Sequence, residues 1–271
     1  MRHILGAAFC APVGRGGASL PRGYAPGAIP DDRGPAGVVG YTPVVTRPGA
    51  PMRGWFITID GPDGSGKTTQ AAALAAHLAD RGIDVHVTRE PGGTWLGERL
   101  REILLARTGS VAPTDPLTDA LLFNAARRQL VTEVVRPALV AGRTVVCARF
   151  ADSTLAYQGF GAGVPLERLQ ALEEAATDGL RPDLTIVLDL AVEDGLARKA
   201  PGDVTRFEAE FDQAFHRRVR DGFLALAAAE PARFTVIDAA GPVSEVALAA
   251  AAAADRLLGS GEPDPLPVRT P

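Results

Sequence analysis

Short apolar runs rich in β-branched residues alternate, between residues 53 and 258, with longer stretches in which apolar residues recur every three or four positions. The first pattern predicts buried strands and the second predicts helices with one packed face. The predicted strands are Trp55–Asp60, Asp84–Thr88, Thr144–Ala148, Leu184–Leu190 and Phe234–Asp238. The predicted helices are Thr68–Arg81, Thr94–Ala106, Asp115–Val140, Leu166–Thr177, Phe207–Ala228 and Val243–Leu257. This alternation predicts one α/β domain with a parallel sheet and helices on both of its faces.

The two ends of the chain lack these periods. Residues 1–51 are rich in Gly, Pro, Arg and Ala, a composition that buries too little apolar surface to offset ordering. We therefore expect either that residues 1–51 form a disordered extension or that the start of translation has been assigned too early. The compositional break at Met52 favours Met52 as the true initiator. A transit peptide fits less well because serine is scarce. The domain is expected to span 52–258, followed by a flexible tail at 259–271.

Charge and composition narrow the classes of partner. The net charge of -4 and the pI of about 5.6 argue against broad binding to nucleic acid or acidic membranes. The sequence has no uninterrupted apolar run of the ~18 residues that a membrane span needs. Cys147 lies inside a predicted strand, so we expect a small buried hydrophobe rather than a disulfide partner or a nucleophile.

The stretch "GPDGSGKTT" follows the first predicted strand and precedes a predicted helix, which is the context that a phosphate-binding P-loop requires. Its glycines let the backbone wrap around phosphates, and the helix N-terminus adds exposed N–H groups. Lys67 can reach the β- and γ-phosphates, and the Thr68 hydroxyl suits a magnesium ion. The context disfavours a glycine-rich turn without a ligand. The predicted ATP-binding residues are Gly61, Pro62, Asp63, Gly64, Ser65, Gly66, Lys67, Thr68 and Thr69.

A second group of candidate ligand-binding residues follows the later strands, where ligands bind in open α/β sheets. Arg89, in "TREPGGT", can hold a second phosphate bidentately, although alone it also fits a surface arginine beside a turn. Phe123 and Arg127, in "LLFNAARRQL", share a helical face and could stack on and read a nucleobase. Their spacing alone favours a core phenylalanine and a solvated arginine. The stretch "DSTLAYQG" adds the polar candidates Ser153, Thr154, Tyr157 and Gln158.

Together with "RFADSTLAYQG" and "RPDLTIVLDL", these stretches resemble bacterial thymidylate kinases in their order and spacing, from about residue 54 to residue 257. The resemblance implies a P-loop kinase fold with a five-stranded parallel sheet and a short lid. It also implies phosphorylation of dTMP to dTDP by ATP and Mg²⁺, in dTTP synthesis, by a cytoplasmic homodimer. Nucleic acids and membranes are not among the implied partners.

The resemblance also implies roles for single residues. Asp63 would bond the 3′-hydroxyl of the acceptor and help organise magnesium, directly or through water. Arg89 and Arg149 would hold the acceptor phosphate. Phe123 would stack on thymine while Arg127 addresses the base. Thr154 would lie near the polar edge of the base, and Tyr157 would crowd the 2′ position. The implied dTMP site comprises Asp63, Arg89, Phe123, Arg127, Arg149, Ser153, Thr154, Tyr157 and Gln158.

The lid is predicted in "ARKAPGDVTRFE", Ala197 to Glu208. Because the P-loop has no arginine of its own, we predict that Arg206 contacts the transferred phosphoryl group; the alternative is a solvated hinge arginine. The predicted catalytic residues are Asp63, Lys67, Arg149 and Arg206. Beyond the lid, apolar residues recur every four positions and predict a core-facing stripe rather than a ligand site: Phe207, Phe211, Phe215, Val219 and Phe223.

Three positions depart from the family pattern. Ala148 and Thr205 each replace an aspartate, and "GAG" at Gly161–Gly163 replaces "GRG". Asp152 either compensates for Ala148 or caps the next helix, and Asp189 is expected to cap the helix that follows it. An active dTMP kinase is therefore the first hypothesis. The alternatives are a nucleotide-binding paralogue with weak or lost kinase activity and a kinase of another nucleoside monophosphate.

Overall fold

A computed structural model of the chain describes residues 53–107, 114–200, 202 and 204–267, so the prediction for residues 1–51 lies outside it. Its centre is a sheet of five parallel strands in the order β2-β3-β1-β4-β5. The strands are β1 (Phe56–Asp60), β2 (Val85–Arg89), β3 (Thr144–Ala148), β4 (Leu184–Asp189) and β5 (Phe234–Asp238). The predicted α/β fold with its parallel sheet is therefore confirmed.

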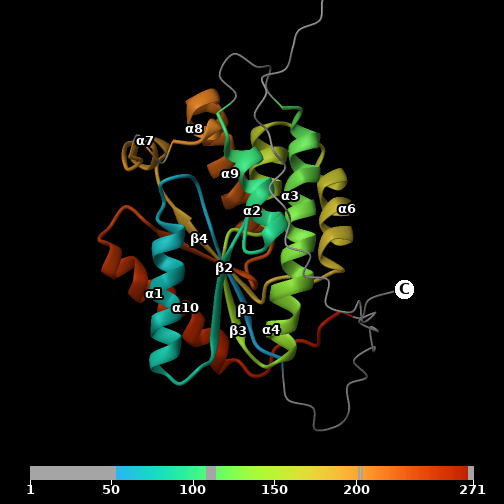
Figure 1. The fold of residues 1–271 in the computed structure, drawn as a ribbon. Coiled ribbons are helices and arrows are strands. Elements are labelled where there is room, and N and C mark those ends of the chain that lie inside the picture. The colour runs from blue at the N-terminus through green and yellow to red at the C-terminus, as the bar shows by residue number, and fades with distance from the viewer. Residues whose placement is uncertain (1–52, 108–113, 201, 203, 268–271) are drawn as a thin grey trace, which may run out of the picture. The chain divides into compact units, whose positions relative to one another are not determined.

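Helices cover both faces of the sheet (Figure 1). On one face, α1 (Lys67–Asp80) and α10 (Val243–Gly259) bury their apolar residues against β1, β3 and β4. The other face is covered by a long helix and by α9 (Gln213–Ala229). The long helix comprises α3 (Pro116–Leu130), the π-helical segment η1 (Val131–Val135) and α4 (Arg136–Val140). The remaining helices are α2 (Trp95–Leu105), α5 (Ala151–Thr154), η2 (Leu155–Gly161), α6 (Leu166–Thr177), α7 (Val192–Ala197) and α8 (Arg206–Glu210).

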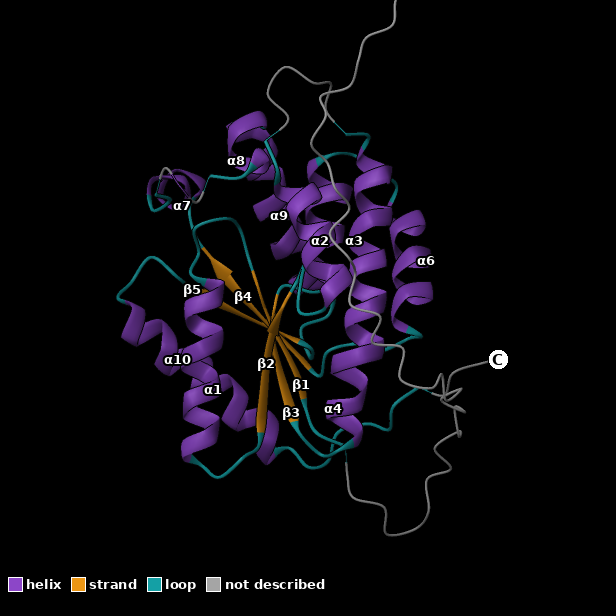
Figure 2. Cartoon of the chain, in the orientation of Figure 1, coloured by secondary structure: helices purple, strands orange, loops and turns teal. Residues whose placement is uncertain are grey.

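The register of the parallel strands aligns their carboxyl ends. Ile59 of β1 and Arg89 of β2 both pair with Ala148 of β3. The segments that follow these three strands therefore leave the sheet at the same edge, which Figure 2 shows at the upper ends of the strands. Ligand sites of open parallel sheets lie at this edge.

The single helix predicted over Phe207–Ala228 is wrong. The structure divides it into α8 and α9, because Phe211 between them is extended, with φ -108° and ψ 145°. Asp212 then begins α9 as its N-cap and accepts a hydrogen bond of 2.7 Å from the Phe215 amide. A capping aspartate at this point competes with continued helix. The period of four in the aromatic residues concealed this break.

The segment 261–267 forms neither helix nor strand but contacts the domain. Leu266 packs against the core beneath α4, and Arg136 donates a hydrogen bond of 3.1 Å to the Pro267 carbonyl. The flexibility of the tail 259–271 stays a prediction, and its residues 268–271 lie outside the described part. No helix in the described part of the chain combines the length and apolar character needed to cross a bilayer.

Candidate active site

A cavity of about 280 Å³ lies at the carboxyl edge of the sheet. Its walls come from the P-loop, α2, α3, the α5–η2 segment and the residues on either side of the α8 start. Most residues predicted for nucleotide binding line it: Asp63, Gly64, Gly66, Lys67, Thr68, Thr69, Phe123, Arg127, Arg149, Ser153, Thr154, Tyr157 and Gln158. The structure therefore brings two groups of residues, far apart in the sequence, to one cavity.

The P-loop connects β1 to α1 through a backbone that only glycine adopts easily. Gly66, the residue before α1, has φ 87°, and Gly64 has φ 75°. A Cβ atom on Gly64 would lie 1.9 Å from the Gly195 carbonyl oxygen. Gly64 is thus required both by its left-handed backbone and by the close approach of the segment after β4.

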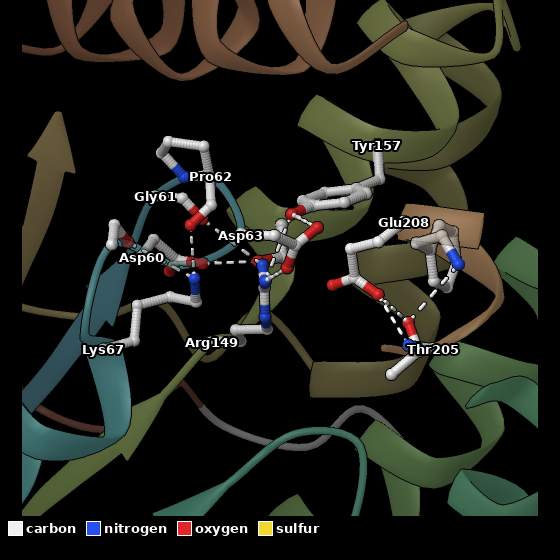
Figure 3. A network of polar contacts seen from close by, with 12 residues as sticks. Asp60, Gly61, Pro62, Asp63, Lys67, Arg149, Tyr157, Thr205 and Glu208 are labelled. Atoms are coloured by element: carbon white, nitrogen blue, oxygen red, sulfur yellow. Dashed lines mark hydrogen bonds and ion pairs between the residues drawn. The ribbon is translucent and has the colours of Figure 1, made fainter. Parts of the chain in front are cut away.

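Lys67 is buried and turned onto its own loop. Its Nζ donates to the Pro62 carbonyl at 2.6 Å and to Ser65 Oγ at 3.3 Å, as Figure 3 shows for Pro62. Burial and then the neighbouring Arg149 lower the pKa of Lys67 to about 7, although Asp63 and Asp60 oppose the shift. Anionic phosphates in the cavity would add counter-charge and raise the pKa of Lys67 again. Pro62 and Ser65 therefore accept hydrogen bonds from Lys67 but do not themselves line the cavity.

The residues present fit a magnesium ion that enters with a nucleotide. Thr68 is exposed and lines the cavity beside Lys67. Within the described ranges, no group of three or more His, Cys, Asp or Glu side chains could hold a metal alone. Mg²⁺ keeps several waters and uses substrate phosphates, so one hydroxyl and a nearby carboxylate suit it better than a protein cage.

Asp63, Arg149 and Tyr157 form a network across the cavity floor (Figure 3). Arg149 Nη2 donates to Asp63 Oδ1 at 2.5 Å, and the Tyr157 hydroxyl donates to Asp63 Oδ2 at 2.7 Å. Burial alone would raise the pKa of Asp63, but Arg149 and Lys67 outweigh burial and hold it below its ordinary value. Asp63 therefore stays ionised, and Arg149 stays directed into the cavity.

Arg127 is buried and surrounded by acceptors. Its Nε donates to Glu90 Oε2 at 2.9 Å, Nη1 donates to Asn124 Oδ1 at 2.9 Å and Nη2 donates to Thr154 Oγ1 at 2.9 Å. The prediction that spacing alone favoured, a solvated Arg127, is wrong: the side chain is only 1% exposed and lines the cavity. Phe123, one turn earlier on α3, lines the cavity too.

Two aromatic residues of the cavity wall, Phe150 and Phe207, are not among the predicted ligand-binding residues. Phe207 was assigned to a core stripe, and it does pack in the core, but it also lines the cavity. Its ring centroid lies 6.3 Å from that of Phe123 and 5.6 Å from that of Tyr157. The spacing of four residues correctly predicted that Phe207 is buried. Only the fold shows that Phe207, at the start of the stripe, also faces the cavity.

Arg89 is not placed as predicted. Its side chain is 49% exposed, pairs with Glu98 and does not line the cavity. Arg101 on α2 lines the cavity instead and donates a hydrogen bond of 2.8 Å to the Pro91 carbonyl. No pattern in the sequence identified Arg101. It lies one turn beyond Gly97, and the packing of Gly97 against the turn containing Gly92 is visible only in the structure.

Arg206 also lies away from the cavity lining, so its position does not support contact with a transferred phosphoryl group. It is 2% exposed, and its Nη2 pairs with Asp119 Oδ2 at 2.8 Å. The predicted solvated hinge is equally wrong. Among the described residues of the predicted lid, those that line the cavity are Lys199, Thr205, Phe207 and Glu208.

The two aspartates discussed as substitutes or caps have other partners. Asp152 accepts hydrogen bonds of 2.7 and 2.9 Å from Arg233, so it does not turn back to replace a carboxylate at Ala148. Asp189 accepts two hydrogen bonds from Arg220, and α7 begins after Ala191 rather than after an aspartate cap. Both are structural residues.

A parallel sheet with a P-loop between its central first strand and α1 defines the class of P-loop proteins, which bind nucleoside triphosphates. The family model for thymidylate kinase matches residues 59–249. Thymidylate kinases of Pseudomonas fluorescens and Deinococcus radiodurans are each 52% identical to this chain, over 72% of it and over 92% and 93% of their own lengths. The crystal structure of thymidylate kinase from Ehrlichia chaffeensis superposes with a TM-score of 0.59 at 34% identity, covering 76% of this chain and 99% of its own. The chain therefore belongs to the thymidylate kinase family.

Proposed function

We propose that the protein transfers the γ-phosphoryl group of ATP to dTMP and so forms dTDP and ADP. The observation that carries this proposal is a single cavity with a complete P-loop on one side and an aromatic, arginine-containing pocket on the other. The Asp63–Arg149 pair joins the two sides. Family membership supports dTMP as the acceptor.

On the ATP side, Lys67 would leave Pro62 and neutralise the β- and γ-phosphates. Thr68 would hold the metal, with Asp63 acting through water. Magnesium supplies charge neutralisation on the phosphates. An oxygen of the dTMP phosphate forms the new bond to the γ-phosphorus, and the bond to the β–γ bridging oxygen breaks as ADP leaves. Because this chemistry needs little covalent help, positioning and charge dominate.

On the acceptor side, Arg149 and Arg101 are the cations that can hold the dTMP phosphate. Phe123 would stack on thymine, and Arg127 would offer its remaining Nη1 hydrogen to the base. Thr154 and Gln158 would lie at the polar edge. Tyr157 would limit space at the 2′ position while its hydroxyl stays on Asp63.

The family resemblance also supports a cytoplasmic homodimer that binds neither nucleic acid nor membrane. Large apolar side chains are exposed on α2 and α3, notably Trp95 at 77% and Ile103 at 63%. Exposed apolar residues on these two helices would favour association with a partner, and a second copy is the partner that the resemblance favours. Light scattering on the purified chain, with Trp95→Glu as the dissociating variant, tests this.

The function itself is tested by measuring ADP release with dTMP, dUMP, UMP, CMP and AMP as acceptors. We expect dTMP to be the best substrate, followed by dUMP. Preference for another monophosphate would favour the alternative kinase. ATP binding without transfer to any acceptor would favour the paralogue with lost activity. This alternative agrees with Ala148, which stands where the family pattern has an aspartate.

A further inference from the structure

Helix α8 forms one wall of the acceptor side of the cavity. Thr205, Phe207 and Glu208, at the start of α8, line the cavity. The Phe207 ring stands between Phe123 and Tyr157, the residues assigned to the base and the sugar. The position of α8 therefore sets the width of the acceptor pocket.

This helix is too short to hold its own position. It spans only Arg206–Glu210, and isolated helices need about 12–15 residues to be even marginally stable. A capping box between Thr205 and Glu208 closes its first turn but fixes nothing outside it. Contacts with the rest of the domain must place α8.

Arg206 provides a charged contact of this kind. Arg206 is the first residue of α8, and its side chain extends between α2 and α3. There Nη2 pairs with Asp119 at 2.8 Å, and Nε donates to the Leu104 carbonyl. Its guanidinium also lies 4.6 Å from the centre of the Phe207 ring. Arg206 and Asp119 are 2% and 3% exposed, so the pair is shielded from solvent and from screening by salt.

The two partners of Arg206, Asp119 and Leu104, lie on helices that also carry residues assigned to the dTMP site. Asp119 lies one turn before Phe123 on α3, and Leu104 lies on α2 with Arg101. The ion pair thus connects α8 to α3, and the hydrogen bond to the Leu104 carbonyl connects α8 to α2. Other contacts hold α8 from the α7 and α9 sides, namely Lys199–Glu208 at 2.6 Å and His216–Phe207 at 3.1 Å.

We propose that Arg206 is a positioning residue that latches α8 over the acceptor pocket through Asp119. The proposal rests on the proposed function, because the pocket matters only if it holds the acceptor. Arg206 acts on acceptor affinity through the docked position of Phe207. It does not contact the transferred phosphoryl group.

The size of the effect follows from population arithmetic. Removing one partner of a buried pair leaves the other charge uncompensated and disfavours the docked state. If the docked fraction falls to roughly one tenth, the apparent acceptor KM rises about ten-fold. ATP binds on the P-loop side, so its KM should change by less than about two-fold.

The test compares Arg206→Met and Arg206→Lys in the full chain, with Arg217→Met as the matched control. Arg217 pairs with Glu193 on the surface, at 56% exposure, and does not line the cavity. Steady-state kinetics supply kcat and the KM values for dTMP and ATP. Amide hydrogen exchange of residues 206–210 reports the docking of α8 without any turnover.

We expect Arg206→Met to raise the dTMP KM about ten-fold and to speed exchange in α8. Arg206→Lys should lie between Arg206→Met and the wild type, and Arg217→Met should match the wild type. A loss of kcat at unchanged dTMP KM would instead assign Arg206 to the transition state and overturn the latch. A lower Tm with unchanged KM and unchanged exchange would overturn it as well.

Two further arms keep the outcomes separate. If Arg206→Met does not fold, Asp119→Asn keeps an acceptor for the guanidinium while removing the charge, and it should move the dTMP KM and the exchange in the same direction. If the wild-type protein does not phosphorylate dTMP, the proposed function fails, and exchange in α8 alone then decides whether the latch exists.

Discussion

Arg149 and Asp63 meet at 2.5 Å between the end of β3 and the P-loop, and the Tyr157 hydroxyl closes the contact by bonding to both. Arg149 reaches this position with φ 69°, a left-handed conformation that is uncommon for a residue other than glycine. Cys147 supports it by donating from Sγ to the Arg149 carbonyl at 3.0 Å. The strained turn directs the guanidinium into the cavity, which is typical of residues that act on a ligand.

Tyr157→Phe tests whether this network matters for transfer. The variant keeps the ring but removes a hydroxyl bonded to two charged groups, and such bonds contribute about 1.5–3 kcal/mol. We expect kcat/KM for dTMP to fall at least ten-fold, while the preference for dTMP over thymidine ribomonophosphate stays, because the ring remains. Tyr157→Ala should lower kcat/KM for dTMP and also lose the preference for the deoxyribonucleotide. Unchanged kcat/KM in Tyr157→Phe would show that the hydroxyl only fills space.

Arg101 and Arg89 make a matched pair of arginines on one side of the site. Arg101 lines the cavity, whereas Arg89 is half exposed and bonded to Glu98. We expect Arg101→Gln to raise the dTMP KM about 10–100-fold, the range of a charge-assisted hydrogen bond. Arg89→Gln should raise it by less than about three-fold. Kinetics with dTMP varied at saturating ATP measure both, and a larger effect at Arg89 would restore the role that the sequence predicted for it.

Glu90 predicts a pH dependence of stability. Burial, only partly offset by Arg127, raises the pKa of Glu90 from 4.5 to about 7. Between these two pKa values the folded state keeps a proton on Glu90 that the unfolded state releases. The resulting contribution to the unfolding free energy is fully present below pH 4.5 and is lost as pH rises through about 7. A pKa shift of this size corresponds to a contribution to the unfolding free energy on the order of 3 kcal/mol.

Glu90→Gln removes this titration and keeps an oxygen for Arg127 Nε. Between pH 5 and 8 the unfolding free energy of the variant should fall less steeply than that of the wild type, measured by urea denaturation at each pH. Glu102→Gln is the control, because Glu102 is a surface glutamate of α2 paired with Arg99. Parallel curves for wild type and Glu90→Gln would contradict the assignment.

Features carried by local sequence were predictable. The alternation of patterns predicted the order and type of every strand, and "GPDGSGKTT" placed the P-loop within its turn because that motif acts through adjacent backbone. Features that depend on side-chain direction were not. Arg101 and Arg89 stand twelve residues apart on either side of a glycine turn, and only the packing of Gly97 decides which one faces the cavity. Arg206 pairs with a residue of α3 that no local pattern connects to the lid.

Ala148 stands where the family pattern has an aspartate. It is 5% exposed and packs with Ile59 and with Ala71 of α1, which shares a helical face with Thr68. A carboxylate here would therefore lie near the start of α1. Asp152 is bound to Arg233 and does not replace it. Loss of a carboxylate from the outer shell of a metal lowers metal affinity or activity by roughly 10–100-fold, so we expect a working kinase with a high magnesium requirement.

Ala148→Asp should therefore lower the magnesium concentration needed for half-maximal kcat by at least about ten-fold. Ala148→Asn, which has the same shape without the charge, should not. Calorimetry of ATP binding at several magnesium concentrations provides a readout apart from turnover, and the aspartate variant should reach its tightest ATP binding at a lower magnesium concentration than the wild type and the asparagine variant do. If the aspartate and asparagine variants behave alike in both measurements, Ala148 is not a deficit, and Thr68, the phosphates and Asp63 already satisfy the metal.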